Sequence, residues 1–377
     1  MQQIKITKLS MKKQEEKERE KERGKKLLFA GQPLFIGMDV HKKSWTLCIL
    51  SAQYELTRIT IESKVDVLVK YLRRNYPGAE IHLVYEAGFC GYWISRELKQ
   101  RGIKSIIANP ADVPTTDKER KNKRDKVDAG KLARSLRNGE LRGIYEPSET
   151  LLEDRSLVRT RSGIVKKQTR VKTQIKSQLN FYGIETPEDI VDKYWSRRYI
   201  SYLESLEFNS TSGKFGFQFL VNELLEHRAR LLAITREIRK LSITERYELL
   251  INLLRTIPGI GLISGMIILT ELFDISRFGG LDKLISYLGL LPTEDSSGEK
   301  ESKGKITPRK NKALRRLIIE ISWIAVRKDP VLLAKFNNDL KRMNKNQAII
   351  KVAKRLVNRI RFVLLNKKPY EILHLES

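Results

Sequence analysis

The sequence predicts an α/β domain followed by a long, mainly helical part. Three observations favour this class: short apolar runs of strand type in the first third, long stretches of helical periodicity in the middle, and apolar helices joined by a Pro-Gly turn further on. The chain has 377 residues, of which 41% are hydrophobic, so it can build two or three domains with their own cores. It contains no apolar run near the roughly 20 residues that a membrane span needs.

The elements of the first domain can be taken in order. Residues 1–30 mix Lys and Arg with a Glu-rich run, so we expect a charged N-terminal extension that buries almost nothing. Strand-type runs follow at 34–40, 44–50, 54–61, 81–87 and 105–110. Helical spacing is found at 65–76, 91–102 and 127–141. The resulting order, β-β-β-α-β-α-β-α, is that of an RNase-H-like fold, which we expect over 31–146.

After Pro147 the sequence has helical periodicity over long distances. Residues 151–183 and 217–242 carry apolar positions every three to four residues, together with dense Lys and Arg. Two such helices can pair with each other or with a second chain as an antiparallel coiled coil, or they can form a plain helical domain. We therefore expect a helical linker or coiled coil over 147–248, and a mainly helical C-terminal domain over 249–377.

The C-terminal domain opens on a helix, a turn beginning at Pro258 and a second apolar helix, as in a helix-hairpin-helix. Glycines let a backbone approach a phosphate, and the N–H groups at the start of the second helix face the anion. This pattern favours contact of Gly259, Ile260 and Gly261 with a DNA backbone. Tight packing of the two helices explains the same glycines, and that alternative stays open.

The charge balance indicates a polyanionic partner. Lys plus Arg number 73 against 45 Asp plus Glu, for a net charge of +28 at pH 7. Such an excess binds phosphate backbones through counterion release, so nucleic acid is the expected partner. A ribosome-associated or membrane-surface protein without chemistry is the alternative. With only Cys48 and Cys90, neither a disulfide framework nor a cysteine zinc site is expected, and a cytoplasmic setting fits.

Four acidic residues stand where a metal site would need them. Asp39 and Glu86 end apolar strands, whereas Asp125 and Asp128 lie three apart at the start of a helix and so share a face. Mg²⁺ prefers such oxygen ligands, and two ions about 3.5–4 Å apart can clamp both oxygens of a phosphoryl displacement. Each acid alone could instead be a turn former or a helix cap. His41 lies beside the cluster and is not counted as a ligand. We expect two Mg²⁺ ions, for which Mn²⁺ can substitute.

Two sets of sequence blocks resemble one known family, the DEDD transposases of bacterial insertion sequences (the "IS one-ten" class, Piv/MooV-like). Its RuvC-like N-terminal domain is similar to FIGMDVHKKSW, VYEAGFCGYWISRELKQRG, ANPADV and KRDKVDAGKLA. Its C-terminal transposase domain is similar to IPGIGLISGMIILTEL, FGGLDKLISYLGLLP and SSGEKESKGKITPRKNKALRRLI. Together the blocks cover most of 34–330 in the family's order. The charged extension before Leu34 is not part of the family pattern.

The resemblance implies a DNA recombinase that cuts and rejoins strands during transposition. It carries over the four carboxylates as metal ligands. It also implies a serine nucleophile that forms a covalent phosphoserine link with DNA. The family motif, a serine before a glycine after LGLLP, falls on Ser297, with neighbouring Ser296 as the alternative. Basic residues downstream are expected phosphate contacts: Lys305, Arg309, Arg315 and Arg316.

The resemblance further implies several partners. These are donor and target DNA, and a structured guide or bridge RNA from the element's own ends, so that base pairing carries the sequence specificity. A homo-oligomer, either a dimer or a tetramer, is expected because strand exchange needs at least two active sites. No membrane partner is expected, and the location implied is the cytosol or nucleoid of a bacterial or archaeal cell.

Two other functions stay open. A metal-dependent nuclease or Holliday-junction resolvase would use the same carboxylates, with water in place of Ser297 as the nucleophile, and would form no covalent adduct. A non-enzymatic nucleic-acid-binding scaffold on a degenerate RNase-H-like fold would need none of these groups. Loss or retention of activity on replacing Ser297 or Asp39 separates the three.

Overall fold

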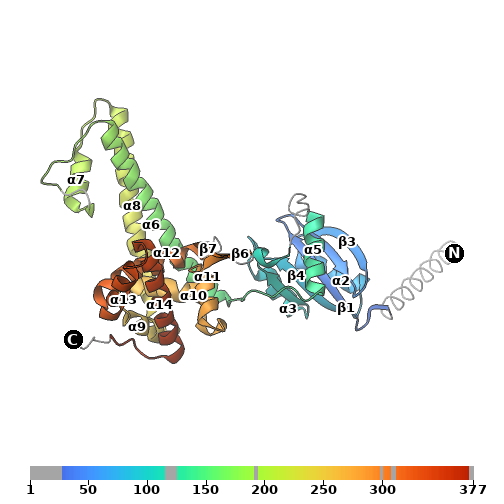
Figure 1. Cartoon of the computed structure of the whole chain (residues 1–377). Helices are drawn as coiled ribbons and strands as arrows, with labels where there is room; N and C mark the ends of the chain where they lie inside the picture. Colours follow the sequence, from blue (N-terminus) through green and yellow to red (C-terminus); the bar gives the residue numbers. More distant parts are fainter. Residues whose placement is uncertain (1–27, 115–124, 191–193, 298–299, 307–310, 373–377) are drawn as a thin grey trace, which may run out of the picture. The chain divides into compact units, whose positions relative to one another are not determined.

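The computed structural model describes residues 28–114, 125–190, 194–297, 300–306 and 311–372. For 125–126, 292–297 and 300–306 it describes the backbone but not the side chains. Most of the expected N-terminal extension therefore lies outside the described residues. The chain divides into two compact units, Met1–Glu146 and Pro147–Ser377 (Figure 1). Among the described helices, none is both long and apolar enough to cross a membrane.

The first unit is built on a five-stranded sheet with the order β3-β2-β1-β4-β5. The first three strands form an antiparallel meander. Strand β4 then pairs with β1 in parallel, and β5 pairs with β4 in parallel. Their bounds are Pro33–Val40 (β1), Ser44–Leu50 (β2), Glu55–Glu62 (β3), Glu80–Glu86 (β4) and Lys104–Ala108 (β5). The element order expected from the sequence is confirmed, since the helices fall between and after these strands as predicted.

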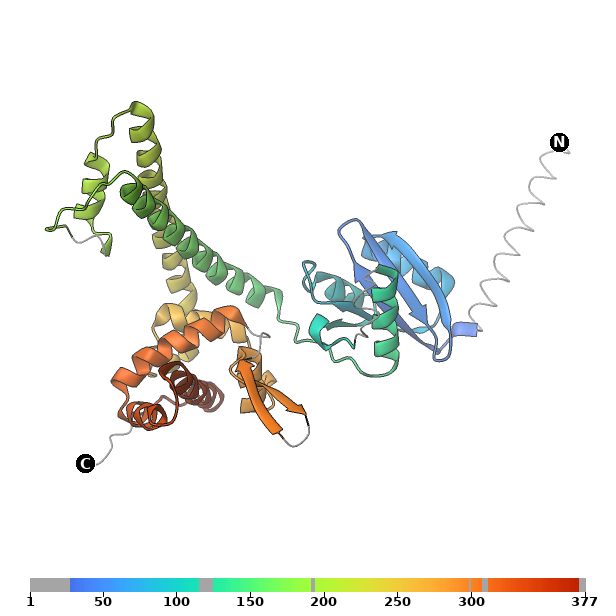
Figure 2. The same ribbon diagram turned by 45° about the horizontal axis from the view of Figure 1, so that its top comes forward.

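Helices cover both faces of this sheet (Figure 2). On one face, α2 (Val65–Asn75) and α3 (Trp93–Gln100) enclose the larger core. Buried side chains of β1 and β4 meet those of the two helices there: Ile36, Met38, Tyr85, Leu68 and Ile94. The other face is covered by α5 (Asp125–Arg137). Because side chains alternate along a strand, residues 37 and 39 of β1 face α5 while 36 and 38 face the larger core.

Position 37 lets α5 lie directly on β1. A Cβ atom at Gly37 would lie 2.1 Å from the carbonyl oxygen of Ala129 and 2.4 Å from the nitrogen of Ala133. Both alanines are fully buried, and they pack with Cys48 of β2. Glycine and alanine at the contact therefore set how close the helix comes to the sheet.

The second unit begins with two long helices that lie side by side in both views (Figures 1 and 2). They are α6 (Glu149–Phe181) and α8 (Thr211–Ser242). Arg161 Nε of α6 donates to Thr235 Oγ1 of α8 over 3.0 Å, while Leu179 near the end of α6 shares a core with Phe217 near the start of α8. The helices are therefore antiparallel. A coiled-coil supercoil stays a prediction. The short α7 (Arg197–Ser205) packs against α8.

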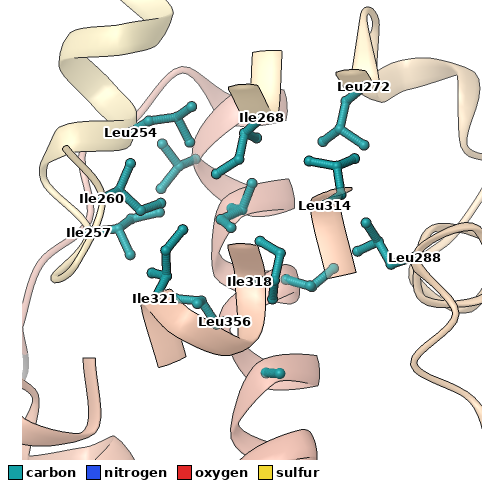
Figure 3. Packing of buried hydrophobic residues seen from close by; sticks show 14 of the residues in the cluster. Leu254, Ile257, Ile260, Ile268, Leu272, Leu288, Leu314, Ile318, Ile321 and Leu356 are labelled. Atoms are coloured by element: carbon teal, nitrogen blue, oxygen red, sulfur yellow. The ribbon is translucent and has the colours of Figure 1, made fainter. Parts of the chain in front are cut away.

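The remaining helices of the second unit pack around the buried side of the amphipathic helix α14 (Lys345–Asn366). They are α9 (Glu248–Arg255), α10 (Leu262–Leu272), α11 (Leu281–Leu288), α12 (Lys312–Lys328) and α13 (Pro330–Leu340). Figure 3 shows side chains of α9, α10, α12 and α14 gathered in this core, among them Leu254, Ile268, Ile318 and Leu356. Val158 of α6 and Ile238 of α8 belong to the same core, so the long helices and the C-terminal helices share one packed centre.

Between α11 and α12 the chain forms a two-stranded antiparallel hairpin. Its strands are β6 (Pro292–Ser297) and β7 (Lys300–Ile306), with Ser297 opposite Lys300. The sequence predicts a mainly helical C-terminal domain and no strand in this segment. The polar run lacks the apolar alternation that marks a half-buried strand, which is why sequence patterning did not predict the hairpin.

Candidate functional site

Asp39 and Glu86 lie at the same level on neighbouring parallel strands. Met38 pairs with Tyr85 in the ladder between β1 and β4, so Asp39 and Glu86 each stand one residue beyond that pair. Met38 and Tyr85 are buried in the larger core, so the next residues project to the opposite face, toward α5. Both acids are partly exposed, and the Asp39 side chain is 24% exposed.

The helix α5 runs against the direction of β4. Leu136, near the helix end, lines a shallow cavity with His82 from the beginning of β4. One turn earlier, Leu132 packs with Val84 of β4 and with Ala108, the last residue of β5. The first turn of α5 therefore lies toward the edge at which β1 and β4 end in their carboxylates.

That first turn holds the other two predicted ligands. Asp128 is 24% exposed, and its Oδ1 lies 3.7 Å from the Nζ atom of Lys131. Asp125 begins the helix three residues earlier, so the two backbones share one side of it. The side chain of Asp125 lies outside those described.

His41 contacts the site through Asp39. Its Nε2 atom is 3.2 Å from Asp39 Oδ2, and its side chain is half exposed. The histidine thus contacts one oxygen of that carboxylate. This contact agrees with the expectation that His41 lies beside the cluster.

The donor chemistry of these residues suits a hard divalent cation, because all four predicted ligands are carboxylates. Among the side chains that the structure describes, no group of three or more His, Cys, Asp and Glu residues is drawn together closely enough to hold a metal ion. Carboxylates without a cation between them repel one another. The assignment of Asp39, Glu86, Asp125 and Asp128 as a metal site therefore remains a prediction.

Ser297 belongs to the second unit. It is the last residue of β6, and Ser296 precedes it opposite Glu301. Lys305 lies on β7, and the side chains of all these hairpin residues are outside those described. The roles expected for Ser297 and Lys305 stay predictions.

The other expected phosphate contacts lie beyond the hairpin. Arg309 lies outside the described residues. Arg315 and Arg316 lie in the first turns of α12; Arg316 is highly exposed and pairs with Glu320 over 2.8 Å. Their contact with nucleic acid also stays a prediction.

The end of the hairpin is fixed by a buried carboxylate that the sequence did not single out. Glu271, 2% exposed, accepts two hydrogen bonds from Arg159, at 2.6 and 2.8 Å, and one from Asn311 Nδ2 at 3.0 Å. Asn311 also caps α12 through Leu314 N, and its own N–H donates to the carbonyl of Tyr287 at the end of α11. Both chain segments that lead into the hairpin are therefore held together at its base.

Burial by itself would raise the pKa of Glu271. The hydrogen bonds from Arg159 and Asn311, together with the positive charge of Arg159, outweigh burial and hold that pKa below its ordinary value. The only sequence signal for this residue is an acid within the otherwise apolar helix α10.

The turn between α9 and α10 is packed against α12. Gly259 has a φ of +90°, and a Cβ there would lie 3.0 Å from the carbonyl oxygen of Ile321. Ile260 is 5% exposed, and Gly261 is exposed at the start of α10, where its N–H donates to Ser264 Oγ. Close packing therefore accounts for Gly259. Contact of the turn with DNA, expected from the helix-hairpin-helix pattern, stays a prediction.

Comparison with known proteins gives two family matches, which cover separate stretches of the chain. Residues 36–184 match a transposase family model of the DEDD type named for IS110, and residues 251–337 match the transposase IS116/IS110/IS902 family. The chain is similar to putative transposase y4qE of Sinorhizobium fredii, 29% identical over 64% of this chain and 58% of that protein. It thus spans less than two thirds of the length of y4qE.

Two further relatives are transposases of named insertion sequences. The transposase for insertion sequence element IS1533 of Leptospira borgpetersenii is 26% identical over 64% of this chain and 70% of its own length. The transposase for IS1111A of Coxiella burnetii is 24% identical over 75% of each.

Proposed function

The chain belongs to the IS110-type family of transposases, and on that premise we propose that it is a DNA recombinase that cuts and rejoins strands by phosphoryl transfer. One structural observation supports this proposal most directly. Asp39 and Glu86 end neighbouring parallel strands, at the edge toward which the first turn of α5 points with Asp128. Carboxylates at one end of the strands can hold cations, and a chain of net charge +28 attracts a polyanion. Together the two features suit a reaction on a polyanionic substrate.

In this proposal Asp39, Glu86, Asp125 and Asp128 hold Mg²⁺, which Mn²⁺ can replace. The bound ions would supply positive charge at the phosphate under attack. The chain's own contribution is to present the oxygens from rigid elements, with His41 fixing one oxygen of Asp39. Because α5 rests on β1 through Gly37, the helical aspartates depend on that packing for their position.

Ser297 is the proposed nucleophile. Its Oγ would form a bond to phosphorus while the bond from phosphorus to the leaving DNA oxygen breaks, and the departing strand end takes up a proton. The phosphoserine ester keeps the energy of the phosphodiester, so attack by a strand end can rejoin DNA and release the serine. Donor and target DNA are the proposed substrates. A structured guide or bridge RNA and a homo-oligomer, either dimer or tetramer, are the proposed partners.

The test is a cleavage reaction on a DNA substrate whose cut strand end is lost, so that a covalent intermediate accumulates. With Mg²⁺ the wild-type chain should yield protein-linked DNA on a denaturing gel. Ser297→Ala should abolish the adduct and reduce cleavage by at least about a thousandfold, because the nucleophile is missing. Ser302→Ala is the matched control on the partner strand and should behave as wild type.

Each other outcome points to a different function. Full cleavage by Ser297→Ala without an adduct would identify a nuclease or resolvase that uses water. An adduct that is lost in Ser296→Ala instead would move the nucleophile by one residue. Asp39→Asn should remove cleavage and retain DNA binding; if it leaves every activity unchanged, the carboxylate site is wrong.

A further inference from the structure

Beyond its first two turns, helix α6 carries positive charge and no acidic residue. Residues 155–184 contain no Asp or Glu, but they contain eight basic residues: Arg155, Arg159, Arg161, Lys166, Lys167, Arg170, Lys172 and Lys176. Its neighbour α8 differs, because Arg230 pairs with Glu226 over 3.0 Å and Lys240 pairs with Glu237 over 2.8 Å. The two long helices α6 and α8 therefore present different electrostatic surfaces.

Some of the basic residues on α6 have structural roles. On the side that packs on α8 and α7, Arg161 donates to Thr235, and burial lowers the pKa of that guanidinium. Lys172 and Lys176 place their ammonium groups over the Trp195 ring, at 5.2 and 6.0 Å from its centroid. Near the base of the helix, Arg159 binds Glu271 and Arg155 lies over Phe273.

Lys166, Lys167 and Arg170 remain, and all three are exposed. At about 100° per residue they fall within one sector of about 100°, whose middle lies about 110° from the middle of the buried side formed by Val171 and Ile175. Gly163 lies in the same sector, and a Cβ there would meet no atom within 4 Å. This sector is the basic face of α6.

The chemistry of the basic face fits a phosphate backbone. The stretch from Arg159 to Asn180 holds no aromatic side chain on which an unpaired base could stack. The three neighbouring cationic side chains therefore suit contacts with phosphates. Such contacts position a nucleic acid without specifying its sequence.

We propose that the basic face of α6 binds the phosphodiester backbone of a nucleic acid duplex, independently of base sequence. This inference rests on the proposed function only in that the chain handles nucleic acid. It needs no cleavage, metal ion or Ser297. Binding can therefore be measured where catalysis fails, and the two proposals fail separately.

The test measures the affinity of the full chain for duplexes of unrelated sequence at several salt concentrations, with a DNA arm, an RNA arm and a single-stranded arm. The variant combines Lys166→Gln, Lys167→Gln and Arg170→Gln, which remove three charges and keep good helix formers. The slope of log affinity against log salt should fall by about 3, one for each lost phosphate contact. The loss should be alike for all duplex sequences.

The matched control combines Lys214→Gln, Arg230→Gln and Lys240→Gln, which remove the same charge from residues already paired with carboxylates. It should change the slope by less than about 1. If the α6 variant lowers the slope for the DNA duplex only or for the RNA duplex only, the proposal is supported and the nucleic acid is identified. If it lowers the slope for both duplexes, the proposal holds for both kinds of backbone. Equal drops in both triple variants, no drop in the α6 variant, or a drop for single strands alone would overturn it. Unchanged helical circular dichroism shows that each variant is folded.

Discussion

Gly37 is the residue at which the first unit can accept least change. A methyl group there would overlap the backbone of α5 at 2.1 Å, and backbone cannot rotate away as a flexible side chain can. We expect Gly37→Ala to lower the free energy of unfolding by about 3 kcal/mol, as overpacked sites do. Urea unfolding followed by circular dichroism measures this change.

Gly163 provides the matched control for that substitution. It lies within α6, where an added Cβ meets open space, so Gly163→Ala should raise the stability by about 0.5–1 kcal/mol through helix propensity. A Gly37→Ala chain as stable as wild type would show that α5 is not held against β1 at that residue.

At the same scale, strand-end acids were predictable and the buried acid was not. Asp39 and Glu86 each follow an apolar run, so their position at a strand end could be read from local pattern. Glu271 depends on Arg159, 112 positions away, and on Asn311, 40 positions away in the other direction. Local pattern contains no information about partners at such separations.

Among the elements, the contact of α10 with α6 and with the start of α12 depends on the charge state of Glu271. The pKa of this carboxyl is lower in the folded chain than the ordinary value of 4.5, so its contribution is complete above the unfolded pKa and is lost as the pH falls through the folded one. Glu271→Gln should cost about 2 kcal/mol near neutral pH. The difference in the free energy of unfolding between wild type and variant should shrink from about pH 5 downward. Chemical unfolding at a series of pH values measures it.

Glu320→Gln is the control for this measurement. Glu320 is an exposed partner of Arg316, and such surface pairs contribute little, so this variant should track wild type at every pH. A gap for Glu271→Gln that stays constant with pH would mean that the ionised carboxylate is not what holds Asn311 and Arg159.

Element boundaries followed local signals where these existed. Helical periodicity over 151–183 gave the observed helix Glu149–Phe181 within two residues at each end. The helix expected over 127–141 ends earlier, at Arg137, because Gly139 takes a positive φ of 71° just beyond it. The strands β6 and β7 lie in a polar run, so no periodic apolar residue predicted them.

For the whole molecule, separate cores predict separate folding. The buried clusters of the first unit contain no residue from the second, and the converse also holds among the described residues. We expect fragments 28–146 and 147–377 each to unfold cooperatively when expressed alone. Thermal unfolding by circular dichroism tests this, and a fragment that binds a hydrophobic dye without a cooperative transition would contradict it.

Charge and order of elements could be predicted at this scale, because they depend on composition and local pattern. The position of Ser297 relative to the carboxylates could not be predicted, since Ser297 and the carboxylates belong to different units of the chain. The predicted metal site likewise depends on carboxylates that repel one another when no cation lies between them.

The hydrogen bond from Asn311 N–H to the Tyr287 carbonyl joins the chain before the β6–β7 hairpin to the chain after it. Leu288 and Leu290 lie between these two residues and are buried in the helical core, so the segment is anchored in that core at its start. Changes of length in the β6–β7 hairpin should therefore leave these two leucines in place, so that the helices on either side keep their packing while the segment around Ser297 varies.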